Sequence, residues 1–303
     1  MNMYRSFCQA IICGVVMLMA QLVFADTVTV GGELALPEVP DSLRTPAERA
    51  DYVMSHFWDA MEWGDTARVN DEKWMEQTFV NFASLIPYAS SQKAIGRAFG
   101  VLFDRAANYE PGYKLLLNLA DRYLYEPESP MYDEQAYVTV LDAVLADSVL
   151  DPVLLTRYRY QLDETMKNRQ GEPANDFALT LMSGEESTLY TMLKDADETL
   201  VMFYDPECDH CHEVIQSLVA SPDVKSRIKS GAMKILAVYF EGEEAMLPQV
   251  QQIIPDGWVS AYTPGNVIEE QELYAIRRLP TLYLIDSKGT VKGKDINPEK
   301  LLN

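Results

Sequence analysis

The feature that most constrains the fold is an apolar run that leads within a few residues into a Cys-x-x-Cys pair. Residues 200–204 read Leu-Val-Met-Phe-Tyr and are followed by Asp205-Pro206, which is typical of a short buried strand that ends in a turn. Cys208 and Cys211 come next, and apolar side chains then recur at helical spacing, at Val214, Ile215, Leu218 and Val219. The pattern predicts a strand, a turn and a helix whose N-terminus carries both sulfur atoms.

The two cysteines differ in what their predicted places allow. A helix N-terminus presents unpaired N–H groups and the positive end of the macrodipole, and both favour a thiolate at Cys208. Cys211 follows one turn later on the same side, from where it can close a disulfide with Cys208 and release a bound partner. Cys208 is therefore the candidate nucleophile and Cys211 the candidate resolving thiol. His212 and Asp205 are local candidates for proton transfer to or from Cys211.

The first 25 residues have the pattern of a secretory signal. One basic residue, Arg5, precedes an uncharged apolar stretch over residues 10–24, and the small residue Ala25 stands before Asp26. We expect cleavage near Ala25 and a soluble protein in the periplasm. The alternative is that the signal stays uncleaved and anchors the chain to the inner membrane, which would be its only contact with the membrane.

Removal of the signal would change the cysteine count. Cys8 and Cys13 lie within it, so the exported chain would keep two of the four cysteines. A structural disulfide framework uses more cysteines, spread along the chain so that they close long loops. The remaining pair, Cys208 and Cys211, is spaced for disulfide exchange.

The charge of the chain limits its partners. The sequence has 46 acidic and 25 basic residues, which gives a formal net charge of −21. Such a field disfavours nucleic acid and anionic membrane surfaces and gives a modest bias towards cationic partners. With 48% apolar residues, the 303-residue chain can bury substantial cores, and its length suggests two domains.

Helical patterns dominate the first half of the chain. Thr45-Pro46-Ala47-Glu48 is a capping box with proline in the first turn of the predicted helix. Further helices are expected over residues 71–86, 91–108, 111–125, 133–146 and 152–168. The aromatic residues of this region fall mostly on apolar faces, where core packing is the default. We expect a signal at 1–25, a leader at 26–44, an all-α domain at 45–169 and a second domain at 170–303.

The period of the apolar residues changes after the Gly171 to Pro173 segment. Strands are expected over residues 177–181, 187–190, 200–204, 233–240 and 258–262, and residues 279–291 read as strand, turn and strand. A helix is expected after the cysteine pair and another over residues 243–254. Strands that alternate with helices indicate a mainly parallel sheet with helices on both faces.

Three segments of the second domain carry a family resemblance. They are Gly-Glu-Pro-Ala-Asn-Asp-Phe at residues 171–177, the Cys208-Asp209-His210-Cys211 motif, and Leu-Pro-Thr-Leu-Tyr-Leu-Ile-Asp at residues 279–286. In order and spacing they resemble exported thioredoxin-like thiol-disulfide oxidoreductases of the ResA and TlpA type, over about residues 171–303. The resemblance implies a thioredoxin-like α/β domain with a mixed sheet covered by helices. It also implies thiol-disulfide oxidoreductase activity.

The resemblance also indicates cofactors and partners. It implies no cofactor beyond a redox-active Cys208–Cys211 disulfide, and as partners the thiols or disulfides of envelope proteins together with a redox partner protein. Upstream, residues 47–50, 56–59 and 123–130 resemble a helical envelope domain of unknown function that precedes such modules. That second resemblance brings an expectation about the fold and none about activity.

The resemblance implies roles for residues of the third segment, 279–286. Pro280 matches the cis-proline whose loop lies against the cysteine pair and offers backbone groups to an extended substrate, and Thr281 follows it as in the family. Leu279 holds the preceding position, where an apolar side chain should keep that side of the site dry. Arg277 and Arg278 could lie near the site, but we expect them to be solvated surface charges.

The residues around the cysteines depart from the reductive members of the family, which carry Trp-Cys-x-Pro-Cys. Here Glu207 precedes Cys208, and Asp209 and His210 fill the loop. A histidine next to the second cysteine, as at His210, is similar to oxidising or isomerising members. A nearby imidazolium or N–H donor stabilises the Cys208 thiolate. The carboxylates of Glu207 and Asp209 have the opposite effect, because they disfavour a further negative charge. These effects have opposite signs, so the direction of electron transfer stays open.

Other interpretations of the cysteine pair compete with catalysis. The pair could be a structural disulfide, or could bind zinc with His210 or His212. A third alternative is an envelope protein-interaction module in which the pair is a redox switch or the thioredoxin fold is degenerate. Peroxidase activity is disfavoured, because the peroxide-reducing relatives need threonine where Asp205 stands.

Overall fold

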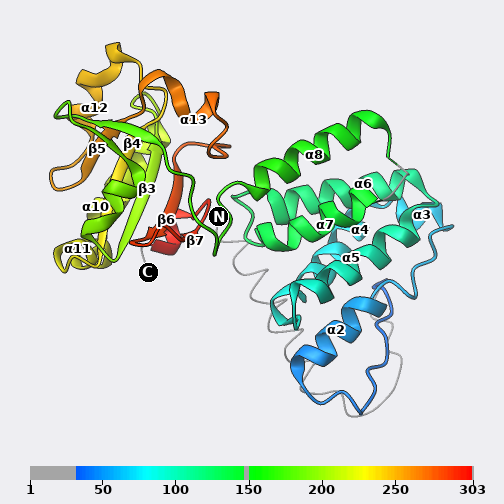
Figure 1. The fold of residues 1–303 in the computed structure, drawn as a ribbon. Helices are drawn as coiled ribbons and strands as arrows, with labels where there is room; N and C mark the ends of the chain where they lie inside the picture. The colour runs from blue at the N-terminus through cyan, green and yellow to red at the C-terminus, as the bar shows by residue number, and fades with distance from the viewer. Residues whose placement is uncertain (1–31, 147–149, 302–303) are drawn as a thin grey trace. The chain divides into compact units, whose positions relative to one another are not determined.

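The computed structural model describes residues 32–146 and 150–301 (Figure 1). The predicted signal and the first part of the leader lie outside the described residues. The chain divides into two compact units between Tyr158 and Arg159, inside helix α8 (Pro152–Met166) and before the boundary expected at residue 169. The longest helices within the described residues have 15 residues, and none is long and apolar enough to cross a membrane.

The N-terminal unit is helical, as the sequence predicts. The capping box is present, since the Glu48 N–H donates to Thr45 Oγ1 over 3.2 Å and the Thr45 N–H donates to Glu48 Oε2 over 2.9 Å. In chain order the elements are α2 (Pro46–His56), α3 (Thr66–Val69), α4 (Glu72–Ala83), a 3-10 turn (Ile86–Tyr88), α5 (Gln92–Ala106), α6 (Glu110–Ala120), a π-helical turn (Asp121–Tyr125), α7 (Glu134–Ala146) and the first part of α8, whose residues from Arg159 on belong to the C-terminal unit. Of these, α3 and the 3-10 turn are short elements that were not predicted from the sequence.

Aromatic side chains fill the core of the helical unit. Phe82 is fully buried, and its ring centroid lies 5.1 Å from that of Phe99 and 5.4 Å from that of Phe57. Phe79 and Phe103 are buried in the same way. The predicted role of these residues in core packing is therefore confirmed.

The C-terminal unit contains one sheet of seven strands in the order β2-β1-β5-β4-β3-β6-β7. Strand β3, which leads to the cysteine pair, lies between β4 and β6. The strands are β1 (Ala178–Leu181), β2 (Glu186–Thr188), β3 (Glu198–Tyr204), β4 (Met233–Tyr239), β5 (Val259–Tyr262), β6 (Thr281–Asp286) and β7 (Val291–Gly293). The helices are α9 (Leu189–Met192), α10 (Asp209–Ala220), α11 (Pro222–Lys229), α12 (Leu247–Ile253) and α13 (Val267–Glu270).

The expectation of a mainly parallel sheet is wrong. Of the strand pairings in the described residues, β3–β4 and β4–β5 are parallel, whereas β1–β2, β1–β5, β3–β6 and β6–β7 are antiparallel. The sheet is mixed because hairpins add strands at both edges of a short parallel centre. This agrees with the thioredoxin-like α/β fold that the family resemblance implies.

The second predicted strand ends earlier than expected. Residues 187–190 were predicted as a strand, but β2 stops at Thr188 and α9 begins at Leu189. The Thr188 hydroxyl accepts a hydrogen bond from the Thr191 N–H over 3.3 Å. This N-cap turns the chain out of the sheet, because a side-chain acceptor satisfies one of the free N–H groups of the helix start.

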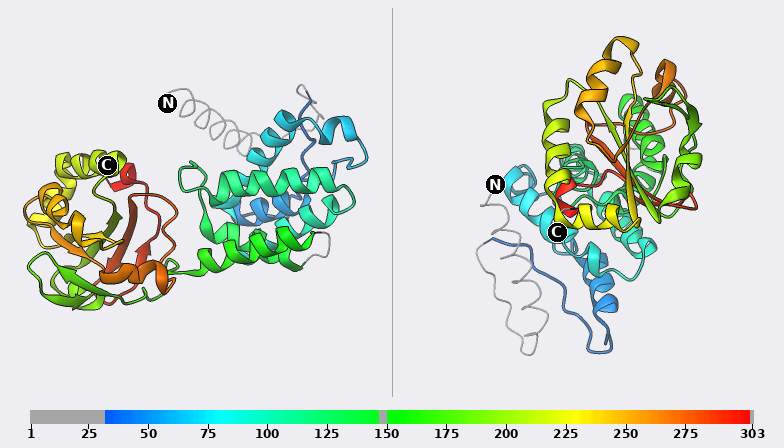
Figure 2. Two further views of the ribbon diagram at one scale, coloured as in Figure 1. Left: turned by 90° about the horizontal axis from the view of Figure 1, so that it is seen from above. Right: turned by 90° about the vertical axis from the view of Figure 1, so that its left-hand side faces the viewer.

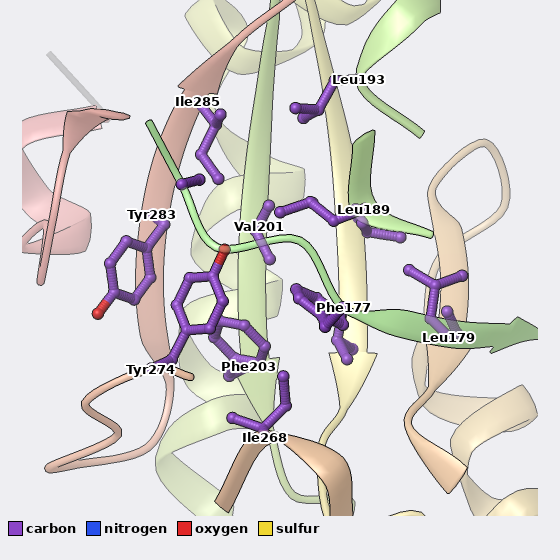
Figure 3. Packing of buried hydrophobic residues seen from close by; sticks show 14 of the residues in the cluster. Phe177, Leu179, Leu189, Leu193, Val201, Phe203, Ile268, Tyr274, Tyr283 and Ile285 are labelled. Atoms are coloured by element: carbon purple, nitrogen blue, oxygen red, sulfur yellow. The ribbon is translucent and has the colours of Figure 1, made fainter. Parts of the chain in front are cut away.

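Alternate residues of the central strands face opposite sides of the sheet. On β3, Val201 and Phe203 belong to one core, while Leu200, Met202 and Tyr204 belong to the other. Helices α9 and α13 contribute to the first core, which Figure 3 shows with Phe203 beside Phe177 and Tyr274. Helices α10, α11 and α12 cover the second, so the sheet has helices on both faces (Figure 2). Both cysteines lie on the second face.

Candidate active site

The strand-to-helix turn lies at the end of β3, as the sequence predicts. Tyr204 is the last strand residue, and Cys208 is the N-cap of helix α10. The Cys208 N–H donates to the Asp205 carbonyl oxygen over 3.2 Å, which closes the turn. Since β3 is held by neighbours on both sides, the helix start is fixed against the sheet.

The Cys208 sulfur receives a backbone hydrogen bond. The Cys211 N–H donates to Cys208 Sγ over 3.1 Å, in the manner of a capping side chain. Both cysteines are free thiols in this structure, and Cys208 is half-buried, so a partner can reach it. The unpaired N–H groups of a helix start stabilise negative charge, so this position suits a thiolate nucleophile.

The loop before β6 lies beside Cys208. The Leu279–Pro280 peptide bond is cis, as the resemblance implies for this proline. The Leu279 carbonyl oxygen lies 3.9 Å from Cys208 Sγ, within the range of a weak S–H hydrogen bond. Pro280 and Thr281 are buried, and Thr281 pairs with Phe203 of β3. The structure thus brings Leu279, Pro280 and Thr281 together with the cysteine pair.

Cys211 is in a different environment from Cys208. It is buried on the sheet side of α10, and burial raises the pKa of its thiol far above the ordinary value. Its hydrogen bond with Cys208 also raises the pKa, while a hydrogen bond with the Asp205 backbone lowers it. The Cys211 thiol is therefore protonated at neutral pH.

This burial predicts a pH dependence of stability for the reduced protein. The Cys211 thiol has an ordinary pKa of about 9 and a raised pKa in the folded state, so the unfolded chain loses its proton first. Stability from this group is complete below pH 9, and above it the free energy of unfolding should fall by up to about 1.4 kcal/mol per pH unit. Urea unfolding of the reduced protein at several pH values from 8 to 10.5 measures this fall in the free energy of unfolding.

A Cys211→Ala variant isolates the effect, because buried tyrosines also titrate at high pH. The variant should lose less stability over the same pH range than the wild type does. Parallel pH profiles for the two proteins would contradict the assignment.

The loop between the cysteines is exposed. Asp209 is the first residue of α10, and His210 Nδ1 lies 3.3 Å from Glu213 Oε2 at the surface. His212 Nε2 donates to the Pro206 carbonyl oxygen over 2.9 Å. His210 and His212 therefore interact with groups other than Cys211, and the predicted proton transfer by His212 stays a prediction.

Asp205 is also engaged within the turn. Its Oδ1 accepts the Glu207 N–H over 2.6 Å, and its negative charge raises the pKa of the Cys211 thiol. Burial raises the pKa of Glu241, which follows β4, and the charges of Asp205 and Glu243 add to the effect. Several acidic side chains therefore lie together where the parallel strands β3 and β4 end, next to the cysteine pair.

The predicted role of Arg277 as a solvated surface charge is wrong. Its side chain is 17% exposed, and Nη2 lies 2.7 Å from Oδ2 of Asp295, whose side chain is 0% exposed. Arg278 is half-buried and donates from Nη2 to the Asp295 carbonyl oxygen over 3.4 Å. The two partners are 18 residues apart in the sequence, so no local pattern predicts this contact.

The described ranges contain no group of three or more His, Cys, Asp or Glu side chains placed to hold a metal ion. Cys208 and Cys211 stay together on one side of the helix start, while His210 and His212 make the contacts described above. The chemistry that the arrangement supports is that of two neighbouring thiols, one accessible and one buried.

Comparison with solved structures identifies the family. A thioredoxin-like protein from Bacteroides caccae has 30% sequence identity to this chain, with a TM-score of 0.79. The match covers 90% of this chain and 97% of that one. The chain belongs to the thioredoxin-like family. Since the match spans nearly the full length of both chains, the helical unit and the thioredoxin-like unit occur together in that protein as well.

Further comparisons match single parts of this thioredoxin-like protein. The family described as domain of unknown function (DUF5106) matches residues 20–168. The C-terminal domain of an uncharacterized protein from Bacteroides fragilis has 34% identity, covers 44% of this chain and 94% of that chain, and has a TM-score of 0.42. A conserved protein of unknown function from the same species has 29% identity, covers 44% and 96%, and has a TM-score of 0.41. No curated protein matches.

Proposed function

We propose that this thioredoxin-like protein is a periplasmic thiol-disulfide oxidoreductase that reduces or exchanges disulfides of envelope proteins through Cys208 and Cys211. The observation that carries the proposal is the placement of Cys208 Sγ. It accepts the Cys211 N–H over 3.1 Å, lies 3.9 Å from the Leu279 carbonyl oxygen, and stays accessible to a partner. Pro280 completes the proposed site beside it.

In the first step the Cys208 thiolate attacks one sulfur of a partner disulfide. A bond forms between Cys208 Sγ and that sulfur, the partner disulfide breaks, and the other partner sulfur leaves as a thiolate that takes a proton. The Leu279–Pro280 segment would align an extended partner beside Cys208. Asp209 and His210 would set the local charge, and Thr281 would hold the segment to β3.

In the second step Cys211 resolves the mixed disulfide. Its thiol gives up a proton and attacks Cys208 Sγ, so that the Cys208–Cys211 disulfide forms and the partner leaves fully reduced. Two electrons have then passed from the two cysteines to the partner, and no other cofactor is needed. A dithiol redox partner protein would return the pair to its reduced form.

The direction of net transfer depends on the reduction potential of the pair. A value near that of thioredoxin, about −270 mV, corresponds to a reductant, and one of about −120 to −180 mV to an oxidant or isomerase. Equilibration in glutathione buffers, followed by thiol alkylation and mass analysis, measures it. Export to the periplasm is supported by the sequence of residues 1–25, and N-terminal sequencing of the secreted form tests it.

We predict that the protein exchanges faster with cationic than with anionic disulfide peptides. The net charge of −21 and the carboxylates of Asp205 and Glu241, after the ends of β3 and β4, attract positive charge to the site. At low salt the rate for a lysine-rich peptide disulfide should exceed that for a glutamate-rich one by roughly tenfold, and salt should reduce the difference. Stopped-flow mixing with fluorescent peptides measures both rates.

A variant with both Cys208→Ser and Cys211→Ser is the control for this assay and should show no exchange. If the wild type and this variant behave alike with every peptide, oxidoreductase activity is excluded. The envelope interaction module is then the better interpretation. Equal rates for the two peptide charges would overturn the electrostatic prediction alone.

A further inference from the structure

The turn after strand β7 carries a buried ion pair that the exchange steps above do not use. The strand ends at Gly293, and the next two residues, Lys294 and Asp295, are buried. Asp295 Oδ2 accepts a hydrogen bond from Arg277 Nη2 over 2.7 Å. Because a buried carboxylate is costly unless it is paired, this contact holds Arg277 firmly to the turn.

The neighbouring arginine is tied to the same turn. Arg278 Nη2 donates to the Asp295 carbonyl oxygen over 3.4 Å, and the Thr281 hydroxyl donates to the Arg278 carbonyl oxygen. The loop is thus held on both sides of Leu279. These contacts therefore also fix the Leu279 carbonyl oxygen, which lies 3.9 Å from Cys208 Sγ.

The turn also makes hydrogen bonds with β6 and with the C-terminal end of α8. The Ile296 N–H donates to the Leu282 carbonyl oxygen of β6 over 3.1 Å. Asp295 has a φ of +50°, a conformation that side-chain-bearing residues adopt rarely and that persists where the surroundings determine it. Lys294 Nζ donates, over 2.7 to 3.2 Å, to carbonyl oxygens at the end of α8, those of Glu164, Thr165 and Lys167.

We propose that Asp295, acting through Arg277, is a positioning residue of the exchange site. It holds the Leu279 segment at the place beside Cys208 where an extended partner segment is aligned with the sulfur. The inference rests on the proposed function and adds to it a residue 15 positions after Pro280 in the sequence. The contrasting case is a purely structural ion pair, which stabilises the unit and leaves exchange with a peptide unchanged.

The test removes both charges of the ion pair together. The double variant Arg277→Met/Asp295→Asn does so, whereas either single change would remove one charge and keep the other in the interior. The matched control is Lys292→Met, which breaks a more exposed ion pair, 3.6 Å long, on the same hairpin. Each full-length reduced protein is first shown to be folded by circular dichroism.

Two reactions of Cys208 are then compared for each variant. One is alkylation by iodoacetamide, which needs only an accessible thiolate. The other is exchange with a peptide disulfide, which also needs alignment along the loop. For the double variant we expect alkylation within about twofold of wild type and peptide exchange slower by about tenfold or more. The single variant Arg277→Lys keeps a positive charge opposite Asp295, so its peptide exchange should be faster than that of the double variant and slower than that of wild type. Lys292→Met should change neither reaction.

An unchanged peptide rate in the folded double variant would overturn the proposal, and so would an equal loss in both reactions. If the wild type itself shows no peptide exchange, the proposed function fails instead. Hydrogen exchange then decides the positioning role, because the amides of residues 279–282 should exchange faster by about tenfold or more in the double variant. Equal amide exchange in the two proteins would overturn it.

Discussion

Replacement of Cys211 by serine is expected to stop turnover and to leave partner proteins covalently attached to Cys208. In the proposed mechanism the attack of Cys211 on the mixed disulfide is intramolecular, and well-oriented intramolecular attack has an effective molarity of about 10⁵ M or more. Without that thiol, release depends on external thiols, so turnover should fall by more than about 10³-fold. The measurement is mass spectrometry of adducts purified with tagged Cys211→Ser protein, after alkylation that stops further exchange.

The matched control is the Cys208→Ser variant, which keeps the buried Cys211. Since the raised pKa of Cys211 keeps its thiol protonated, this variant should form no adducts above background. Adducts that form equally through Cys211 would contradict the assignment of nucleophile and resolving thiol. A complete lack of adducts in Cys211→Ser protein would contradict exchange catalysis as a whole.

Truncation of Phe203 to alanine is expected to produce the largest loss of stability in the C-terminal unit. Phe203 is fully buried, and its ring centroid lies 5.0 Å from that of Tyr274 and 5.8 Å from that of Phe177 (Figure 3). Removal of a buried phenylalanine ring costs about 3–5 kcal/mol, because the surrounding residues fill the cavity incompletely. Amide hydrogen exchange in β3 and β4 should therefore accelerate by about 100-fold or more.

Val219→Ala serves as the comparison, because Val219 is 38% exposed on α10 and its truncation should change stability by less than about 0.5 kcal/mol. Phe203 packs on the face of the sheet opposite to the cysteine pair. Alkylation of Cys208 in the folded Phe203→Ala protein should therefore proceed at the wild-type rate. A stability loss below about 1 kcal/mol would show that this core repacks around the cavity.

Local chemistry explains which parts of the fold could be predicted from the sequence. The apolar run that ends at Asp205-Pro206 and the helical spacing after Cys211 both depend on neighbours in the chain, and β3 and α10 form where expected. The capping box at Thr45 depends on residues three positions apart and is present as predicted. The cysteine pair at the helix start follows from these local patterns.

Whether neighbouring strands are parallel or antiparallel could not be predicted in the same way. The apolar runs at residues 200–204 and 279–286 indicate strands. Neither run indicates which strand pairs with it, or whether that pairing is parallel or antiparallel. The antiparallel pairing of β3 with β6, which places Thr281 opposite Phe203, is a contact between segments far apart in the chain. The tertiary fold made the sheet mixed rather than mainly parallel.

The features of the candidate site also fall into those set by local sequence and those set by the tertiary structure. The sequence alone determined that Cys208 and Cys211 lie one turn apart at a helix start, because that relation needs only the spacing of residues within one helix. Only the tertiary structure decided that Cys211 is buried and that Arg277 pairs with Asp295 near the Pro280 loop. Burial and long-range ion pairs depend on which surfaces pack together, and that information is spread over the whole chain.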